Sequence, residues 1–145
     1  MTGRYVFDAE AIIAYLYGEP GHDVVAEYLE DIRDGPVDGF LAETNAGEVF
    51  YLVARLEGVD ESPTADSLRA ADRDVRALQR RGLRIERADW RLAAEVKADG
   101  GVSFADAHGV ALARERDATL IAGADEGFDA LQVAVDVVRF RDEAA

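Results

Sequence analysis

The chain has 145 residues, of which 49% are hydrophobic, and this length and composition predict a single domain over residues 1–145 with an ordinary packed core. The absence of cysteine excludes disulfides, thiolate-bound zinc and a cysteine nucleophile, and with only 2 histidines any bound metal is expected to have oxygen ligands. The 30 acidic residues against 16 basic ones give a net charge of −14, which argues against non-specific binding to nucleic acid.

The first half of the chain alternates short apolar runs with helical patterns. Residues 5–7 form the first predicted strand, and a helix follows until the glycines and proline of residues 18–21 break it. A second helix is predicted to run to residue 34, before Gly35 and Pro36, and residues 37–41 form the second predicted strand. The spacing of apolar residues then predicts a third helix over residues 45–57, which ends at Gly58.

The second half continues this alternation. Ser62 and Pro63 are a typical helix start, and the helix that they begin is expected to reach residue 81. A short strand at residues 83–85 and a helix at 88–98 follow, and Ser103 is the predicted N-cap of a helix to residue 116. Residues 119–121, 125–131 and 135–138 are predicted as a strand, a short helix and a last strand. Such an alternation favours an α/β fold with a mainly parallel sheet.

Four carboxylates stand where a parallel sheet would bring ligands together. Asp8 follows the first strand and Asp125 follows the strand at 119–121, so both should emerge at the carboxyl edge of the sheet. Glu48 and Asp106 are expected in the first turns of their helices, where the helix dipole favours anions. If those helices begin at the same edge, the four acids converge, and a divalent cation such as Mg²⁺ would remove their mutual repulsion.

Each of these acids also has an alternative interpretation as a cap or turn residue. Asn45-x-x-Glu48 and Ser103-x-x-Asp106 both match the pattern in which an acid at the third helical position satisfies backbone donors. The other two acids could simply begin a turn or a short helix. Spacing alone therefore leaves metal binding and helix capping as alternatives, and it does not predict a nuclease.

The residues around the four acids resemble the motifs of the PIN-domain family of ribonucleases. The matching segments are Tyr-Val-Phe-Asp8-Ala-Glu-Ala-Ile-Ile-Ala-Tyr-Leu with the Gly-Glu-Pro-Gly that follows it, Asn45-Ala-Gly-Glu48-Val-Phe-Tyr, Gly-Val-Ser103-Phe-Ala-Asp106-Ala-His and Leu-Ile-Ala-Gly-Ala-Asp125-Glu-Gly-Phe128. Each motif is degenerate by itself, but the four occur in order and with suitable spacing over nearly the whole chain. Within the family, a single-domain chain of this size looks most like a VapC-type toxin of a type II toxin–antitoxin system.

The resemblance implies a PIN-like three-layer α/β/α fold around a central, mainly parallel sheet. It implies a Mg²⁺- or Mn²⁺-dependent endoribonuclease in which Asp8, Glu48, Asp106 and Asp125 are the catalytic, metal-binding acids and RNA is the substrate. A VapC-type protein is further expected to be held inactive by a cognate antitoxin protein and to form homodimers.

The location and environment of the protein are also predicted. The sequence has no signal-peptide pattern and no apolar run that could span a bilayer, so we expect a cytoplasmic protein without membrane contact. Lys97 is the only lysine, and such an acid-rich, lysine-poor composition predicts a halophilic protein whose hydrated carboxylates keep it soluble at high salt.

Two positions depart from the family pattern. Hydroxyl or amide residues often follow the first acid, whereas here alanine and Glu10 follow, so Glu10 is a candidate additional ligand. A hydroxyl is also common two residues before the fourth acid, where this chain has Gly123 and would lose a supporting hydrogen bond. Asp125 is the least secure of the four acids because Glu126 and Asp129 lie close enough to replace it.

Four arginines recur at helical spacing on one side of the predicted helix after Pro63, and they have two interpretations. They are Arg69, Arg73, Arg76 and Arg80. They could contact phosphates along an RNA backbone, or they could form a solvated face that pairs with neighbouring aspartates. His108, two residues beyond Asp106, should point to another helix face and is interpreted as a structural or peripheral residue.

Three other functions remain open. One is a housekeeping PIN-domain ribonuclease that matures RNA without an antitoxin. Another is a catalytically degenerate PIN domain that only binds RNA or a partner. The third is a phosphotransfer domain, prompted by Asp8 and Glu10; it requires a lysine late in the domain, and Lys97 lies in no matching context.

Overall fold

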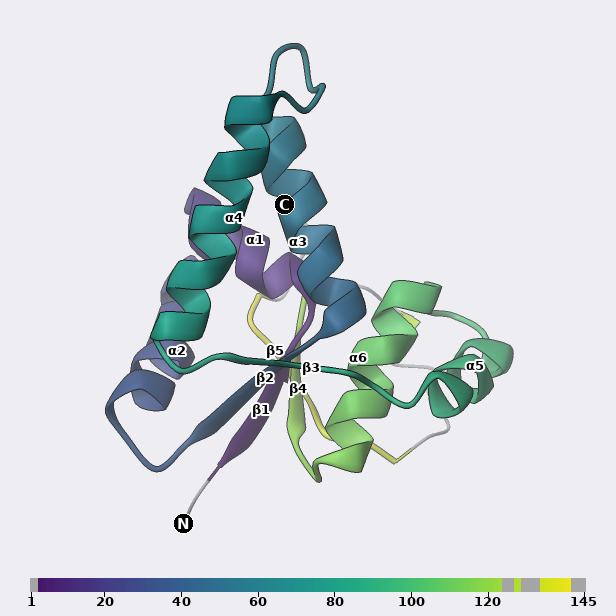
Figure 1. The fold of residues 1–145 in the computed structure, drawn as a ribbon. Coiled ribbons are helices and arrows are strands. Elements are labelled where there is room, and N and C mark those ends of the chain that lie inside the picture. Colours follow the sequence, from purple (N-terminus) through teal and green to yellow (C-terminus); the bar gives the residue numbers. More distant parts are fainter. Residues whose placement is uncertain (1–2, 124–126, 129–133, 142–145) are drawn as a thin grey trace.

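The structure is a computed structural model that describes residues 3–123, 127–128 and 134–141. Within these ranges a sheet is covered by helices on both faces (Figure 1). The strands are β1 (Arg4–Phe7), β2 (Asp38–Ala42), β3 (Arg84–Glu86), β4 (Thr119–Ala122) and β5 (Val137–Arg139). The helices are α1 (Ala9–Tyr17), α2 (His22–Asp34), α3 (Glu43–Leu56), α4 (Ala65–Arg80), α5 (Trp90–Asp99) and α6 (Phe104–Glu115).

The sheet has the strand order β3-β2-β1-β4-β5, and all of its pairings are parallel. The predicted α/β class is therefore confirmed. The order reverses at β1, which pairs with β2 on one side and with β4 on the other. Ligands of such sheets bind beyond the carboxyl ends of the strands at this reversal point. Here the reversal brings the end of β1 next to the end of β4, with Phe7 opposite Ile121.

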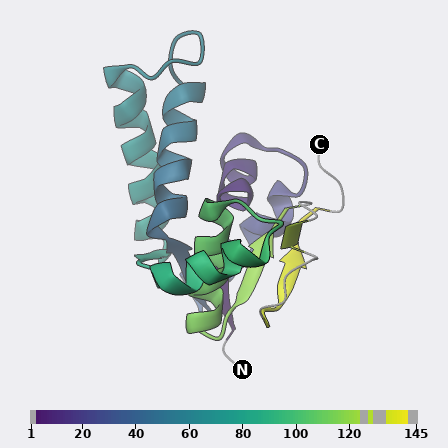
Figure 2. The same cartoon turned by 90° about the vertical axis from the view of Figure 1, so that its right-hand side faces the viewer.

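Alternating side chains of the strands build two separate cores. Phe7 and Ile121 pack with α1, α2, α3 and α4, whereas Val6 and Leu120 pack with α5 and α6 on the opposite face. Figure 2 looks onto the side covered by α5 and α6, with β5 at the edge of the sheet. The predicted three-layer α/β/α arrangement is confirmed by these two cores.

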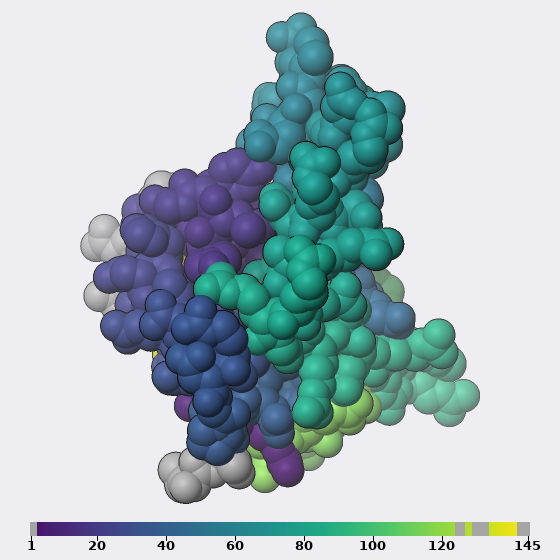
Figure 3. Space-filling model, turned by 60° about the vertical axis from the view of Figure 1, so that its left-hand side comes forward, coloured from purple at the N-terminus to yellow at the C-terminus, as the bar shows by residue number. Residues whose placement is uncertain are grey.

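Helices α3 and α4 lie side by side and extend beyond the sheet, as Figures 1 and 3 show, and together with the linking residues 57–64 we call them the arm. At its tip Val59 and Ser62 exchange backbone hydrogen bonds of 3.0 and 2.9 Å, so Ser62 is not the N-cap predicted from the sequence. Thr64 caps α4 instead, in a reciprocal pair of hydrogen bonds with Ser67.

The arginines of α4 are all exposed. Two of them pair with aspartates of their own helix, Arg69 with Asp66 and Arg76 with Asp72 at 2.8 Å. Two of the four arginines therefore pair within their own helix, as expected if this face of α4 is solvated. Across the part of the chain that the structure describes, no helix is long and apolar enough to cross a membrane.

Candidate active site

Asp8 lies directly beyond β1, where the sequence predicted it, and its carboxylate is the N-cap of α1. Oδ1 accepts a hydrogen bond from the Ala11 N–H at 2.8 Å, and Oδ2 accepts a long one of 3.4 Å from the Gly123 N–H beyond β4. The Asp8 N–H donates to the Ile121 carbonyl at 3.0 Å. These contacts fix the carboxylate between α1 and β4, and the residue is only 2% exposed.

The surroundings of Asp8 disfavour its charge. The pKa of Asp8 is raised to about 7, mainly by burial and also by the negative charges of Glu10 and Asp106, while the hydrogen bonds from Ala11 and Gly123 act in the opposite direction. The acids of β1, α1 and α6 are thus within electrostatic reach of one another. A positive charge placed among them would stabilise the ionised form of Asp8.

Glu48 is held by a buried amide rather than by a helix cap. The Asn45 Nδ2 donates to Glu48 Oε1 at 3.0 Å and to the Ala105 carbonyl of α6 at 3.1 Å. Asn45 therefore directs Glu48 towards the N-terminal turn of α6. Its Oδ1 is buried without a partner among the described residues, and it lies so near Gly109 that a Cβ there would be 3.2 Å away.

The predicted capping role of Asn45 is wrong, because β2 leads directly into α3. The helix begins at Glu43 with Ala42 as its N-cap, so Asn45 is already inside the helix. Glu48 consequently lies in the second turn and not in the first turn that the sequence indicated.

Asp106 occupies the first turn of α6, as predicted. Ser103 is the N-cap of that helix, and its Oγ accepts the Asp106 N–H at 3.0 Å. His108 makes local contacts, since its ring lies 4.9 Å from the Phe104 ring and its Nδ1 lies 2.8 Å from the Phe104 carbonyl oxygen. These contacts agree with a structural or peripheral role for His108.

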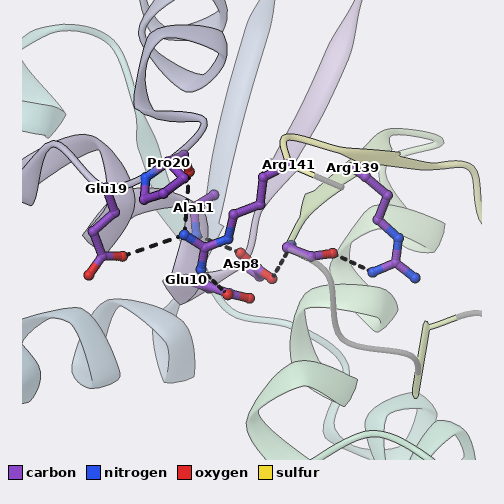
Figure 4. Close-up of polar contacts among 8 residues, drawn as sticks. Asp8, Glu10, Ala11, Glu19, Pro20, Arg139 and Arg141 are labelled. Carbon is purple, nitrogen blue, oxygen red and sulfur yellow. Dashed lines mark hydrogen bonds and ion pairs between the residues drawn. The ribbon is translucent and has the colours of Figure 1, made fainter. Parts of the chain in front are cut away.

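An arginine that sequence reasoning missed reaches the same edge of the sheet. Arg141, just beyond β5, forms an ion pair with Glu10 on the first turn of α1 (Figure 4). It also lies 3.8 Å from Glu19 and donates to the Pro20 carbonyl at 3.3 Å. No local pattern indicated this contact, because Arg141 is separated from Glu10 by 131 positions.

The donor set fits a hard divalent cation in its chemistry. Carboxylate oxygens are what Mg²⁺ and Mn²⁺ prefer, and a cation would offset the cost of ionising Asp8 that burial and the nearby acids impose. Among the described residues no three acidic or histidine side chains are grouped closely enough to hold an ion. The predicted Asp125, together with its alternatives Glu126 and Asp129, lies outside the described residues.

Comparisons with known proteins agree with this architecture. The family model of the PIN domain matches residues 5–134. No curated protein gives a significant match. Among solved structures, a chain of VapBC2 from Rickettsia felis, bound to a promoter DNA fragment, is similar with a TM-score of 0.68 and 12% identity, over 94% of this chain and 98% of the other.

Two further structures share the fold. A chain of FitAcB from Neisseria gonorrhoeae has a TM-score of 0.64 and 19% identity, covering 94% of this chain and 97% of that one. VapC20 from Mycobacterium tuberculosis, a toxin that cleaves the sarcin–ricin loop, has a TM-score of 0.55 and 19% identity, covering 79% and 85%. At these identities the similarity concerns the fold.

Proposed function

The chain belongs to the PIN-domain family, and from this premise we propose that it is a metal-dependent endoribonuclease that hydrolyses phosphodiester bonds of RNA. The observation that carries the proposal is the environment of Asp8, a buried carboxyl group at the reversal point of the sheet whose pKa is raised to about 7 by burial and by nearby acids. Perturbed acids in such a position are typical of functional sites.

We propose that Asp8, Glu48, Asp106 and Asp125 hold Mg²⁺ or Mn²⁺. When bound, such a cation activates a water molecule and offsets negative charge on the scissile phosphate. The residues of the chain supply orientation: the N–H groups of α1 and Gly123 fix Asp8, and Asn45 steers Glu48 towards α6. No protein nucleophile is required, which agrees with the absence of cysteine.

The toxin assignment is the finer part of the proposal. It is supported by the fold shared with chains of the VapBC2 and FitAcB complexes and with the toxin VapC20. We expect a cognate antitoxin protein, a homodimer and a cytoplasmic location, where RNA substrates are found. If a small neighbouring gene encodes that antitoxin, its co-expression should relieve growth arrest by this chain. A chain that never arrests growth and lacks such a gene would instead favour a housekeeping ribonuclease.

The test is a cleavage assay on total RNA at high salt with Mg²⁺, Mn²⁺ or EDTA. Asp8→Asn retains an N-cap oxygen but removes the charge, and it should lower the cleavage rate by at least about 100-fold. Asp38→Asn is the matched control, because Asp38 lies at the start of β2 and pairs with Arg84 at 3.7 Å. Wild-type cleavage by Asp8→Asn, or undiminished cleavage in EDTA, would contradict the proposal.

A further inference from the structure

The ion pair of Glu10 and Arg141 lies within the proposed active site but has no role in the function described so far. Glu10 is two residues beyond Asp8, and its negative charge contributes to the raised pKa of that residue. Its side chain is 36% exposed, whereas that of Arg141 is only 10% exposed. The carboxylate is thus more accessible than the arginine that holds it. Figure 4 shows how the two side chains meet.

The contacts leave one oxygen of Glu10 available. Arg141 donates to Oε1, and within the part of the chain that the structure describes Oε2 accepts no hydrogen bond. Arg141 is itself anchored by Glu19 and by the Pro20 carbonyl, so the guanidinium is fixed from the side of the turn between α1 and α2. Because the anchored guanidinium of Arg141 holds Oε1, it restricts the direction in which Oε2 of Glu10 can point.

Gly123 supplies the space that Glu10 occupies. A Cβ on Gly123 would lie 2.7 Å from Glu10 Oε1 and closer still to Oε2. The backbone of Gly123 does not have a positive φ, so its conformation would accept other residues. A side chain at residue 123 would therefore have to displace the Glu10 carboxylate from its present position.

We propose that Glu10 is a fifth acid of the metal site, that its Oε2 is an oxygen ligand of the cation, and that Gly123 and Arg141 are the residues that position it. This inference rests on the proposed metal-dependent function. It explains both departures from the family pattern as one compensated change, because Glu10 fills the space that a side chain at residue 123 would need. Arg141 is a positioning residue, since it acts through Glu10.

The inference is tested by measuring Mn²⁺ affinity of the full chain without RNA, by electron paramagnetic resonance of the free ion. Glu10→Ala should weaken Mn²⁺ binding about tenfold, in the range found for residues that support metal sites. Gly123→Ala should weaken it equally, because the added Cβ displaces the carboxylate. The double variant should bind no worse than either single variant, since both remove the same interaction.

Variants of the arginine separate positioning from folding. Arg141→Met should weaken Mn²⁺ binding less than Glu10→Ala does, and Arg141→Lys should restore part of the loss by keeping a positive charge. Asp38→Asn is the matched control: it removes a carboxylate that pairs with an arginine at the start of β2 and should leave Mn²⁺ affinity unchanged. Thermal unfolding of each variant reports whether it is folded.

The outcomes distinguish this inference from the proposed function. Unchanged Mn²⁺ affinity in Glu10→Ala, with only a lowered Tm, would mean that the ion pair is purely structural and would overturn the inference. Additive losses in the double variant would overturn the coupling of Glu10 to Gly123. Unchanged Mn²⁺ affinity in Asp8→Asn would instead refute the proposed function itself.

Discussion

The two edges of the sheet treat their acidic residues differently. At the amino edge, where β1 and β2 begin, arginines and acids line a groove of about 330 Å³, and two of these acids have arginine partners. Glu86, the last residue of β3, contributes its side chain to this groove and lies 2.6 Å from Arg116, and Asp38 lies 3.7 Å from Arg84. At the carboxyl edge, by contrast, the described partners of Asp8 and Glu48 are neutral donors: backbone N–H groups for Asp8 and the Asn45 amide for Glu48.

This comparison separates acids that are paired with arginines from acids that are candidates for metal binding. In this groove an arginine offsets the charges of Asp38 and Glu86 within the chain. At the carboxyl edge Arg141 likewise pairs with Glu10, so the contrast concerns Asp8 and Glu48. A neutral donor orients a carboxylate but leaves its charge, and at the carboxyl edge the pKa of Asp8 rises to about 7. Among the described residues, the buried acid without a counter-charge therefore marks the candidate site better than the abundance of acids does.

The largest expected effect removes a charge at the carboxyl edge. Glu48→Gln preserves the shape of the side chain, and it should reduce the cleavage rate by about 100-fold, because the cation would lose a ligand while Tm changes little. Initial rates on a labelled RNA and a melting curve check this expectation. A large fall in Tm with unchanged cleavage would make Glu48 a structural acid like those of the opposite edge.

Removal of a neutral donor should have the next largest effect. Asn45→Ala leaves Glu48 without its orienting amide, so Mn²⁺ affinity should fall about tenfold. Because Asn45 is fully buried and links α3 to the Ala105 carbonyl, stability should also fall by about 1–3 kcal/mol. Metal titration and urea unfolding measure the two effects. Wild-type affinity in a destabilised variant would contradict the orienting role.

The variant Asp8→Asn should change how the stability of the protein depends on pH. Asp8 ionises near pH 3.8 in the unfolded chain and near pH 7 in the folded, metal-free protein. Its ionisation therefore has no effect on stability below about pH 4, and it destabilises the fold increasingly between pH 4 and pH 7. Asp8→Asn in EDTA should therefore raise Tm by roughly 5 °C at pH 8, and the gain should shrink towards pH 4. A variant that melts below wild type at pH 8 would refute this.

The smallest effect is expected at the amino edge. Arg116→Met breaks a partly exposed ion pair with Glu86, so stability should fall by at most about 1 kcal/mol. Mn²⁺ affinity and cleavage should stay at their wild-type values. A tenfold change in either would show that the two edges are coupled and would end the contrast between them.

The local sequence patterns predicted the parallel fold and the positions of Asp8 and Asp106 because both depend on nearby residues. A strand end and a Ser103 cap are visible within a few residues. The start of α3 was misplaced because β2 runs into it without a loop, so no turn signal separates them. Helix capping could not reveal that Asn45 reaches across to α6.

The contact between Gly123 and Glu10 is a second feature that the sequence could not predict. The missing side chain was visible as a departure from the family pattern, but its reason lies in Glu10, on a different element. The partner that holds Glu10 is more distant still, and a contact between α1 and the segment after β5 has no local signature. Long-range charge pairs of this kind follow from the fold and not from periodicity.

The contact between Arg141 and Glu10 also determines when the site can form during synthesis of the chain. A ribosome synthesises a chain from its amino end, so Gly123 and Arg141 emerge more than a hundred residues after Asp8 and Glu10. Until then β1 lacks its neighbour β4, and neither Asp8 nor Glu10 has its final contacts. With the proposed activity, a chain assembled in this order would stay incomplete beside the RNA of the ribosome until Arg141 has emerged.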